Sequence, residues 1–265
     1  MNPSLIKEYT RVVWVTAKMS YREMWNDLFV LFTIVIQPLC VALLALYMLR
    51  DKGSDYAIFV VVGGGMTGLW SSLVFISGNS ITRERWTGTL EILVGLPTPL
   101  WVITLGKNLA HVSQSLISMI ASYILASYIF GYALSVANPV GFVISLALTV
   151  IAFISFGLIM APVYLINPAV QSFQNALEFP IYTLCGFLFP IALLPGWTTP
   201  LSYILPPYWA ARVLHITSRG GHDFSEILFC WAMLLLFTIV YFALASRFFT
   251  LILKRARVSA TLGLD

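Results

Sequence analysis

Charged side chains are scarce in this chain. They make up 10% of its 265 residues, against 59% hydrophobic residues, and the mean hydropathy is +0.89. Soluble domains carry about 25% charged residues. The composition therefore predicts an integral membrane protein. We expect an all-α one, because backbone groups inside lipid must find their hydrogen-bond partners within the spanning segment.

Cysteine and histidine are also few and widely separated. Cys40, Cys185 and Cys230 lie in apolar runs, so we expect them to be small buried side chains. Their spacing predicts neither a disulfide framework nor a zinc site, and the three histidines show no metal-ligand spacing. We expect no metal site, no catalytic residue and no nucleic-acid partner.

A nucleotide-binding loop is absent from the sequence. No G-x-x-x-x-G-K-[ST] pattern occurs, and Gly106-Lys107-Asn108 lacks both the first glycine and the hydroxyl residue. An activity that depends on ATP would therefore need a different chain to bind the nucleotide. Asn167-Pro168-Ala169 spells the N-P-A of water channels, but it occurs once where such channels need two, and it is an ordinary turn signal.

Six apolar runs are long enough to cross a bilayer, whose core of about 30 Å needs roughly 20 helical residues. We expect spans at residues 28–49, 56–80, 101–130, 139–166, 172–194 and 226–252, within one membrane domain over residues 1–265. The first run is too long for the core of a cleavable signal peptide.

The distribution of lysine and arginine predicts the orientation of these spans. With both termini inside, the cytoplasmic segments hold eleven of these residues and the external segments hold four. The cytoplasmic ones are Lys7, Arg11, Lys18, Arg22, Arg83, Arg85, Lys107, Arg247, Lys254, Arg255 and Arg257, and the external ones are Arg50, Lys52, Arg212 and Arg219. This asymmetry obeys the positive-inside rule. We expect a multi-pass protein of the cytoplasmic (plasma) membrane with both termini in the cytoplasm.

Residues 3–25 form an amphipathic segment. Its basic residues, Lys7, Arg11, Lys18 and Arg22, are spaced as one narrow stripe of a helix. Trp14 suits the headgroup level of a bilayer. We expect a helix in the cytoplasmic interface with its basic stripe facing lipid phosphates, and a soluble helix packed on a partner is the alternative.

Residues 190–212 alternate prolines and aromatic residues with apolar ones. The segment is too apolar for a solvated loop and too broken for one helix. We expect short re-entrant helices between the fifth and sixth spans, with Trp197, Tyr208 and Trp209 at the outer interface.

The stretch Arg83–Pro99 is a short amphipathic segment between two apolar runs. Glu84 and Glu91 are seven residues apart, so on one helix over residues 83–97 they would share a face. Pro97 and Pro99 would end that helix. A simple interfacial connector is the alternative.

The run E-R-W-T-G-T-L-E at Glu84–Glu91, followed by Pro97-Thr98-Pro99 and by Gly106-Lys107, resembles the cytoplasmic coupling helix of ABC-type-2 (type V) exporter permeases. The family pattern is approximately E-R-E-x-G-T-L-E, then a proline-containing stop and a G-K at the next span. Trp86-Thr87 departs from it, where the family often has a further charged residue. The layout of spans extends the resemblance over nearly the whole chain.

This resemblance implies that the segment docks on a separate ATPase subunit. The residues that would couple the two are Arg83, Glu84, Arg85, Gly88, Thr89, Leu90 and Glu91. It further implies two ATPase subunits, which would bind ATP and magnesium, and a second permease copy or a related permease. No cofactor is expected in this chain.

Polar residues recur on one face of two of the predicted spans. On the third span they are His111, Ser115, Ser118 and Ser122, for which we favour helix packing, as we do for Gly64-x-x-x-Gly68 on the second. On the fifth they are Gln171, Gln174, Asn175, Glu178 and Tyr182. Polar groups facing lipid are costly, so this second stripe should line a translocation path or form a polar dimer seam.

The leading interpretation is the membrane-spanning subunit of an ATP-driven exporter. It would move a hydrophobic or amphipathic compound, such as a drug, antibiotic, lipid or lipid-linked glycan, out of the cytoplasm. A six-span channel or passive pore is the alternative. An ATPase that co-purifies with the chain would favour the exporter, and conduction by the chain alone would favour the channel.

Overall fold

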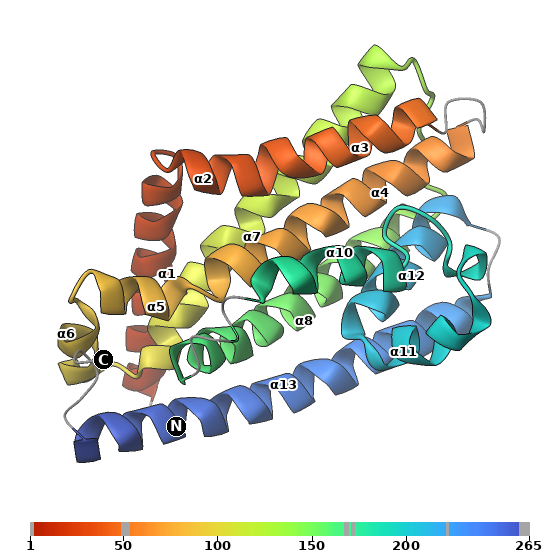
Figure 1. Ribbon diagram of the computed structural model, residues 1–265. Coiled ribbons are helices and arrows are strands. Elements are labelled where there is room, and N and C mark those ends of the chain that lie inside the picture. The colour runs from red at the N-terminus through yellow and green to blue at the C-terminus, as the bar shows by residue number, and fades with distance from the viewer. Residues whose placement is uncertain (1–2, 49–53, 167–169, 171–172, 221–222, 260–265) are drawn as a thin grey trace.

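The computed structural model describes residues 3–48, 54–166, 170, 173–220 and 223–259. These residues form helices joined by short connections, and none of them lies in a strand. Figure 1 shows most of the long helices running in broadly the same direction, with helix α1 across one end. The predicted all-α membrane fold is confirmed.

Four helical runs in the described part of the chain are long and apolar enough to cross a membrane: Tyr56–Trp86, Leu100–Ile129, Pro139–Leu165 and Phe224–Leu251. They consist of α4 (Ser54–Ser71) with the π-helical η3 (Ser72–Ser77) and α5 (Ser80–Trp86); α7 (Leu100–Ile124) with the π-helical η4 (Leu125–Ile129); α8 (Pro139–Ile166); and α13 (Phe224–Ser259). These runs match the second, third, fourth and sixth predicted spans.

The first predicted span is a helix in three consecutive pieces. These are α2 (Leu28–Leu31), the π-helical η1 (Phe32–Ile36) and α3 (Gln37–Met48). Pro38 cannot donate a backbone hydrogen bond, and its ring crowds the preceding turn, which explains a wider turn just before it.

The fifth predicted span is shorter in the structure than the apolar run suggested. Residues 172–194 were expected to form one span, but α10 covers only Gln174–Leu184, 11 residues. Such a helix is about 16 Å long, roughly half the hydrocarbon core. Gly186, with a φ of 68°, then redirects the chain. The described helices therefore do not establish a count of six spans.

The proline-rich segment after α10 consists of short helices, as expected. They are the 3-10 turns η5 (Ile191–Leu193) and η6 (Gly196–Thr198), then α11 (Thr199–Ile204) and α12 (Pro206–Arg219). Helix α12 runs seven residues beyond the predicted limit of 212 and packs against α4, α8 and α13. Trp197 is exposed, but Tyr208 and Trp209 are buried within the protein, so their expected place at the outer interface was wrong.

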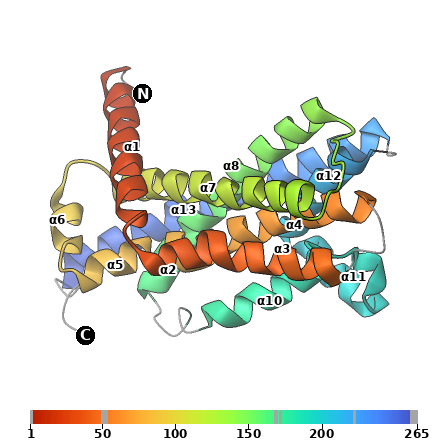
Figure 2. The ribbon, with the colours of Figure 1, turned by 90° about the horizontal axis from the view of Figure 1, so that it is seen from above.

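Helix α1 (Pro3–Met24) crosses the end of the bundle instead of running along it, as both views show (Figures 1 and 2). The four residues of the basic stripe, Lys7, Arg11, Lys18 and Arg22, are all exposed. Ala17 and Ser20 are buried on the side that packs against α7. A helix across the ends of the spans has the orientation that an interfacial helix needs, and its contact with lipid stays a prediction.

Helix α4 forms the centre of the bundle. Every residue from Ala57 to Val74 is buried. A Cβ at Gly68 would lie 2.3 Å from the hydroxyl oxygen of Ser118 on α7, so the glycine lets the two helices approach closely. Ser118 is fully buried and donates to the carbonyl of Ser115 at 2.6 Å. The glycine motif and the serine stripe therefore pack against each other, which confirms packing for both.

Two of the three cysteines are buried as expected, Cys185 and Cys230. The expectation for Cys40 was wrong, because Cys40 is exposed on the outer side of α3.

Candidate coupling site at the α5–α6 segment

The stretch predicted as one helix over residues 83–97 is two short helices. Helix α5 ends at Trp86, and α6 covers Leu90–Gly95. Between them Gly88 has a φ of 73°, a left-handed conformation that favours glycine. The single-helix prediction was wrong because it gave that glycine no weight. Glu84 and Glu91 consequently do not share a helix face.

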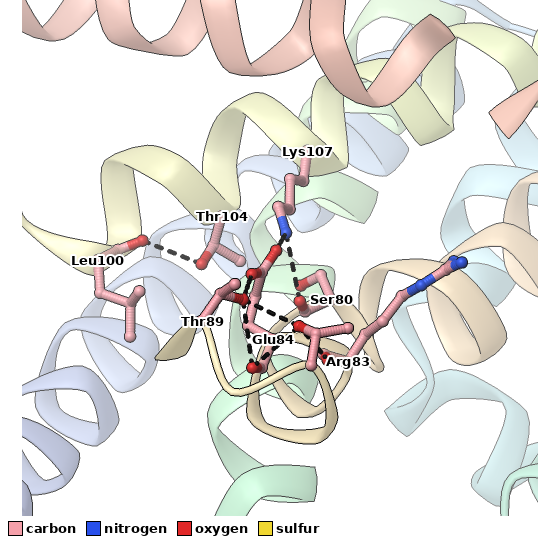
Figure 3. A network of polar contacts seen from close by, with 8 residues as sticks. Ser80, Arg83, Glu84, Thr89, Leu100, Thr104 and Lys107 are labelled. Atoms are coloured by element: carbon pink, nitrogen blue, oxygen red, sulfur yellow. Dashed lines mark hydrogen bonds and ion pairs between the residues drawn. The ribbon is translucent and has the colours of Figure 1, made fainter. Parts of the chain in front are cut away.

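Glu84 is the centre of a polar network that joins the two short helices to α7 (Figure 3). Its carboxylate forms an ion pair with Lys107 of α7 and accepts a hydrogen bond from the hydroxyl of Thr89, just before α6. The Lys107 ammonium also lies 3.5 Å from the carbonyl oxygen of Ser80 at the start of α5. The side chains of Glu84 and Lys107 are only 23% and 17% exposed. Glu84 therefore engages its own subunit.

The two parts of the sequence motif, Glu84–Glu91 and Gly106-Lys107, meet in this network. Lys107 supplies the cation for Glu84, while Gly106 beside it faces α1. A Cβ at Gly106 would lie 2.7 Å from the carbonyl oxygen of Val13, so only glycine allows α1 this close to α7. The motif thus holds three elements together: α1, α7 and the α5–α6 segment.

Arg83 ties α5 to the turn between α1 and α2. Its guanidinium lies 3.0 Å from the carboxylate of Asp27. Asp27 also caps α2, because its side chain accepts hydrogen bonds from the backbone of Phe29 at 3.1 Å and of Val30 at 3.4 Å. Asp27 was not predicted as a site residue. An aspartate directly before an apolar run was the signal that could have indicated it.

Helix α6 is anchored by Leu90, which is 2% exposed and packs with Ile81 and Leu100. Its opposite side is open: Ile92 is 67% exposed, Glu91 is exposed, and Trp86 at the end of α5 is 72% exposed. We call these three residues the outer face of the α5–α6 segment. Leu90 thus anchors the segment, and the outer face is what another protein could contact.

The polar stripe predicted on the fifth span is turned into the protein. Glu178 is 2% exposed and accepts hydrogen bonds from Gln37 at 3.0 Å, Ser71 at 2.6 Å and Tyr182 at 2.5 Å. Gln174 accepts one from Asn79 at 3.0 Å.

These partners lie on α3, on α4 and just after η3, so three members of the stripe bond within their own chain. Gln171 and the side chain of Asn175 lie outside the described residues. Gln37 was not predicted as a partner, although a glutamine in a long apolar run could have indicated one. A translocation path along this stripe stays a prediction.

The arrangement described so far is that of a helical membrane protein with an anchored, outward-facing segment at one end of its bundle. The model of the ABC-2 type transporter family matches residues 11–218, which include this segment and α10. The chain belongs to the ABC-2 type transporter family and is a multi-pass membrane component of a transporter.

The sequence identity to individual relatives is low. The chain is 27% identical over 155 residues to "Probable multidrug ABC transporter permease YbhR" of Escherichia coli (strain K12), covering 57% of this chain and 41% of that protein. It is 26% identical over 151 residues to "ABC transporter G family member 41" of Oryza sativa subsp. japonica, covering 56% of this chain and 10% of that protein. It is 23% identical over 176 residues to family member 49 of the same plant, covering 66% of this chain and 11% of that protein. These matches cover between 10% and 41% of the length of the relatives.

Proposed function

We propose that this chain is the membrane-spanning subunit of an ATP-driven exporter that moves a hydrophobic or amphipathic compound out of the cytoplasm. Membership of the transporter family supports a role in transport. The name of the bacterial relative, a probable multidrug permease, is consistent with an apolar or amphipathic cargo. The chain would perform no covalent chemistry itself.

The observation that carries the proposal is the network around Glu84. The outer face of the α5–α6 segment belongs to the same unit as Glu84, and Glu84 is tied to Lys107 on α7. Helix α7 with η4 extends for 30 residues, from the α5–α6 end toward the other end of the bundle (Figure 1). A force on the outer face would therefore be passed to a helix that runs through the subunit, which is what a two-state transporter requires.

The proposal includes partners, which membership of the transporter family supports. Two ATPase subunits, each holding ATP and magnesium, would dock on the outer faces of two permease copies, or of this chain and a related permease. Both termini and the α5–α6 segment would lie in the cytoplasm and the helices in the cytoplasmic membrane, as the positive-inside rule favours. Helix α1 would lie on the inner leaflet through its exposed basic stripe.

Co-purification tests the proposal. An affinity-tagged chain isolated from its own membranes should carry a P-loop protein, identified by mass spectrometry, and should hydrolyse ATP. The double variant Trp86→Ala, Glu91→Lys should lose that protein while keeping its unfolding temperature, because both side chains point outward. Tyr128→Ala is the matched control, since Tyr128 is 83% exposed but lies on η4.

Two results would contradict the proposal. One is equal ATPase recovery with the double variant and with wild type. The other is ion or solute flux through liposomes that contain only this chain, without ATP, which would favour the channel.

A further inference from the structure

A cavity of about 670 Å³ is bordered mainly by α12 and by the connection from α10 to α11. Figure 1 shows α11 and α12 at the end of the bundle opposite the α5–α6 segment. The walls of the cavity are one side of α12, the connection from α10 to α11, and the start of α4 and α13. Sites for small molecules have volumes of about 300–1,000 Å³ and combine apolar walls with a few polar groups. The size and position make this cavity a candidate binding site separate from the coupling site.

Helix α12 lines the cavity with a row of polar side chains. Tyr208, Arg212, His215 and Arg219 are spaced four, three and four residues apart, so they lie on one face of the helix. Arg212 is held in place, because its guanidinium lies 2.5 Å from the carboxylate of Glu226 and 3.0 Å from the hydroxyl of Tyr208. Its side chain is still 32% exposed, so it can meet a ligand without first being ordered.

Arg219 and His215 share the ring of Phe59 on α4. The imidazole stacks on that ring with centroids 3.6 Å apart and planes 5° apart, and the Arg219 guanidinium lies 5.7 Å from the same centroid. Arg219 is exposed. The cationic group is therefore positioned at the cavity by an aromatic platform.

His215 is a buried polar group in the cavity wall. It is 8% exposed, and its ring lies beside the backbone of Gly186 and Phe187 as well as beside the cavity. Burial lowers the pKa of His215, which lies outside the candidate spans, to about 3. The imidazole is therefore neutral and offers one donor and one acceptor. A polar ligand atom that reaches the ring can therefore form a hydrogen bond with it.

The charges favour an anion. The described residues that line the cavity include two cations, Arg212 and Arg219, and one carboxylate, Glu226. The other lining residues are largely apolar or aromatic, among them Ile191 and Tyr203.

We propose that this cavity binds an amphipathic organic anion, with its charged group against Arg212 and Arg219 and its acyl or aromatic body against Ile191, Tyr203 and Tyr208. This inference goes beyond the proposed function, because binding requires neither ATP nor an ATPase; of the two sources below, the transported compound alone rests on the proposed function. The anion can come from two sources, a phospholipid of the adjoining leaflet or a transported compound that passes this end of the subunit, and both have the same chemistry.

Calorimetric titration of the delipidated chain in a neutral maltoside detergent tests the proposal with defined probes. Lysophosphatidylglycerol should bind at least about tenfold more tightly than zwitterionic lysophosphatidylcholine, and inorganic phosphate should not bind measurably, since it lacks the apolar body. Arg219→Gln should weaken lysophosphatidylglycerol binding by about tenfold or more. Arg247→Gln is the matched control, because Arg247 is an exposed arginine on α13 away from the cavity.

Two further variants keep the test decisive if Arg219→Gln fails to fold. Ala192→Trp, at an exposed residue of the cavity wall, should fill the space and abolish binding. Glu226→Gln should strengthen binding, because it removes the anion that competes for Arg212. Equal binding by wild type, Arg219→Gln and Ala192→Trp, or equal affinity for the two lysophospholipids, would overturn the proposal.

The same variants also distinguish the two sources of the anion. An anionic phospholipid that co-purifies with wild type but not with Ala192→Trp supports the site with a resident lipid. The wild-type chain could instead co-purify with no such lipid and still bind lysophosphatidylglycerol. That result supports the site with a transported anion as its ligand.

Discussion

Glu84 and Lys107 are 23 residues apart in the sequence, on α5 and α7, and they form an ion pair in which both side chains are less than a quarter exposed. The sequence contained both residues within the resemblance, but as separate parts of it. Their pairing could not be predicted, because it depends on the turn at Gly88 and on how α5 lies against α7. The sequence alone predicts that an acidic side chain in a charged loop is exposed. Only the three-dimensional course of the loop shows that this one is not.

Replacing Lys107 by Met should destabilise the chain by about 1–3 kcal/mol, because a half-buried carboxylate loses its charged partner. It should also lower ATP hydrolysis coupled to transport, since the α5–α6 segment loses its tie to α7. The exchange Glu84→Lys, Lys107→Glu should recover part of both, as a double-mutant cycle would show. Unfolding temperature in detergent and ATPase activity of the complex are the measurements. Wild-type values for Lys107→Met in both assays would show that the pair has no such role.

Glu178 offers a second residue-level test, because glutamine keeps the size of its side chain and one of its two carboxyl oxygens. Glu178→Leu would leave the donors on Gln37, Ser71 and Tyr182 without their acceptor, and we expect a loss of several kcal/mol. Glu178→Gln keeps one acceptor oxygen and should lose less. Phe179→Leu, at an exposed neighbour, should change little. Thermal unfolding would rank the stabilities of the three variants. If Glu178→Leu is as stable as wild type, these hydrogen bonds contribute nothing to stability.

At the scale of the elements, the sequence predicted long helices well and short ones poorly. Apolar runs near 20 residues gave four of the helices directly, since the bilayer dictates both their length and their composition. The failures were α10 and the α5–α6 segment. In both, one glycine with positive φ, Gly186 or Gly88, ends the helical path inside a stretch whose composition continues unchanged. Periodicity describes a helix but does not show where it stops.

Two glycines test how α1 is attached. A Cβ at Gly106 would meet the backbone of Val13, whereas a Cβ at Gly95 would meet nothing within 4 Å. Gly106→Ala should therefore push α1 away from α7 and cost about 1–3 kcal/mol. Gly95→Ala should be neutral or stabilise α6 by up to about 1 kcal/mol, because alanine favours the helix. Unfolding temperatures of the two variants give the comparison, and equal effects would mean that α1 can shift without loss.

For the whole molecule, the composition and the distribution of basic residues led to the membrane class and to an orientation. The pairing of specific faces came only from the structure, because many apolar helices could pack together with similar burial. The glycine motif of α4 and the serines of α7 show how far the sequence can predict packing. Each was predicted to pack, but nothing in the sequence indicated that Gly68 lies against Ser118.

The two ends of the bundle should lie on opposite sides of the membrane, even though α10 is short. The α5–α6 segment and the α11–α12 region occupy opposite ends in Figure 1. Ile92 on α6 and Leu193 on η5 are 67% and 72% exposed, so cysteines there should react with a charged maleimide that cannot cross membranes. Cys40 is replaced by Ser beforehand because it is exposed, whereas Cys185 and Cys230 are buried. In intact cells Leu193→Cys should react at once, and Ile92→Cys only after the membrane is opened. If both react from the same side, the chain between residues 92 and 193 crosses an even number of times, and the predicted crossing at residues 172–194 does not exist.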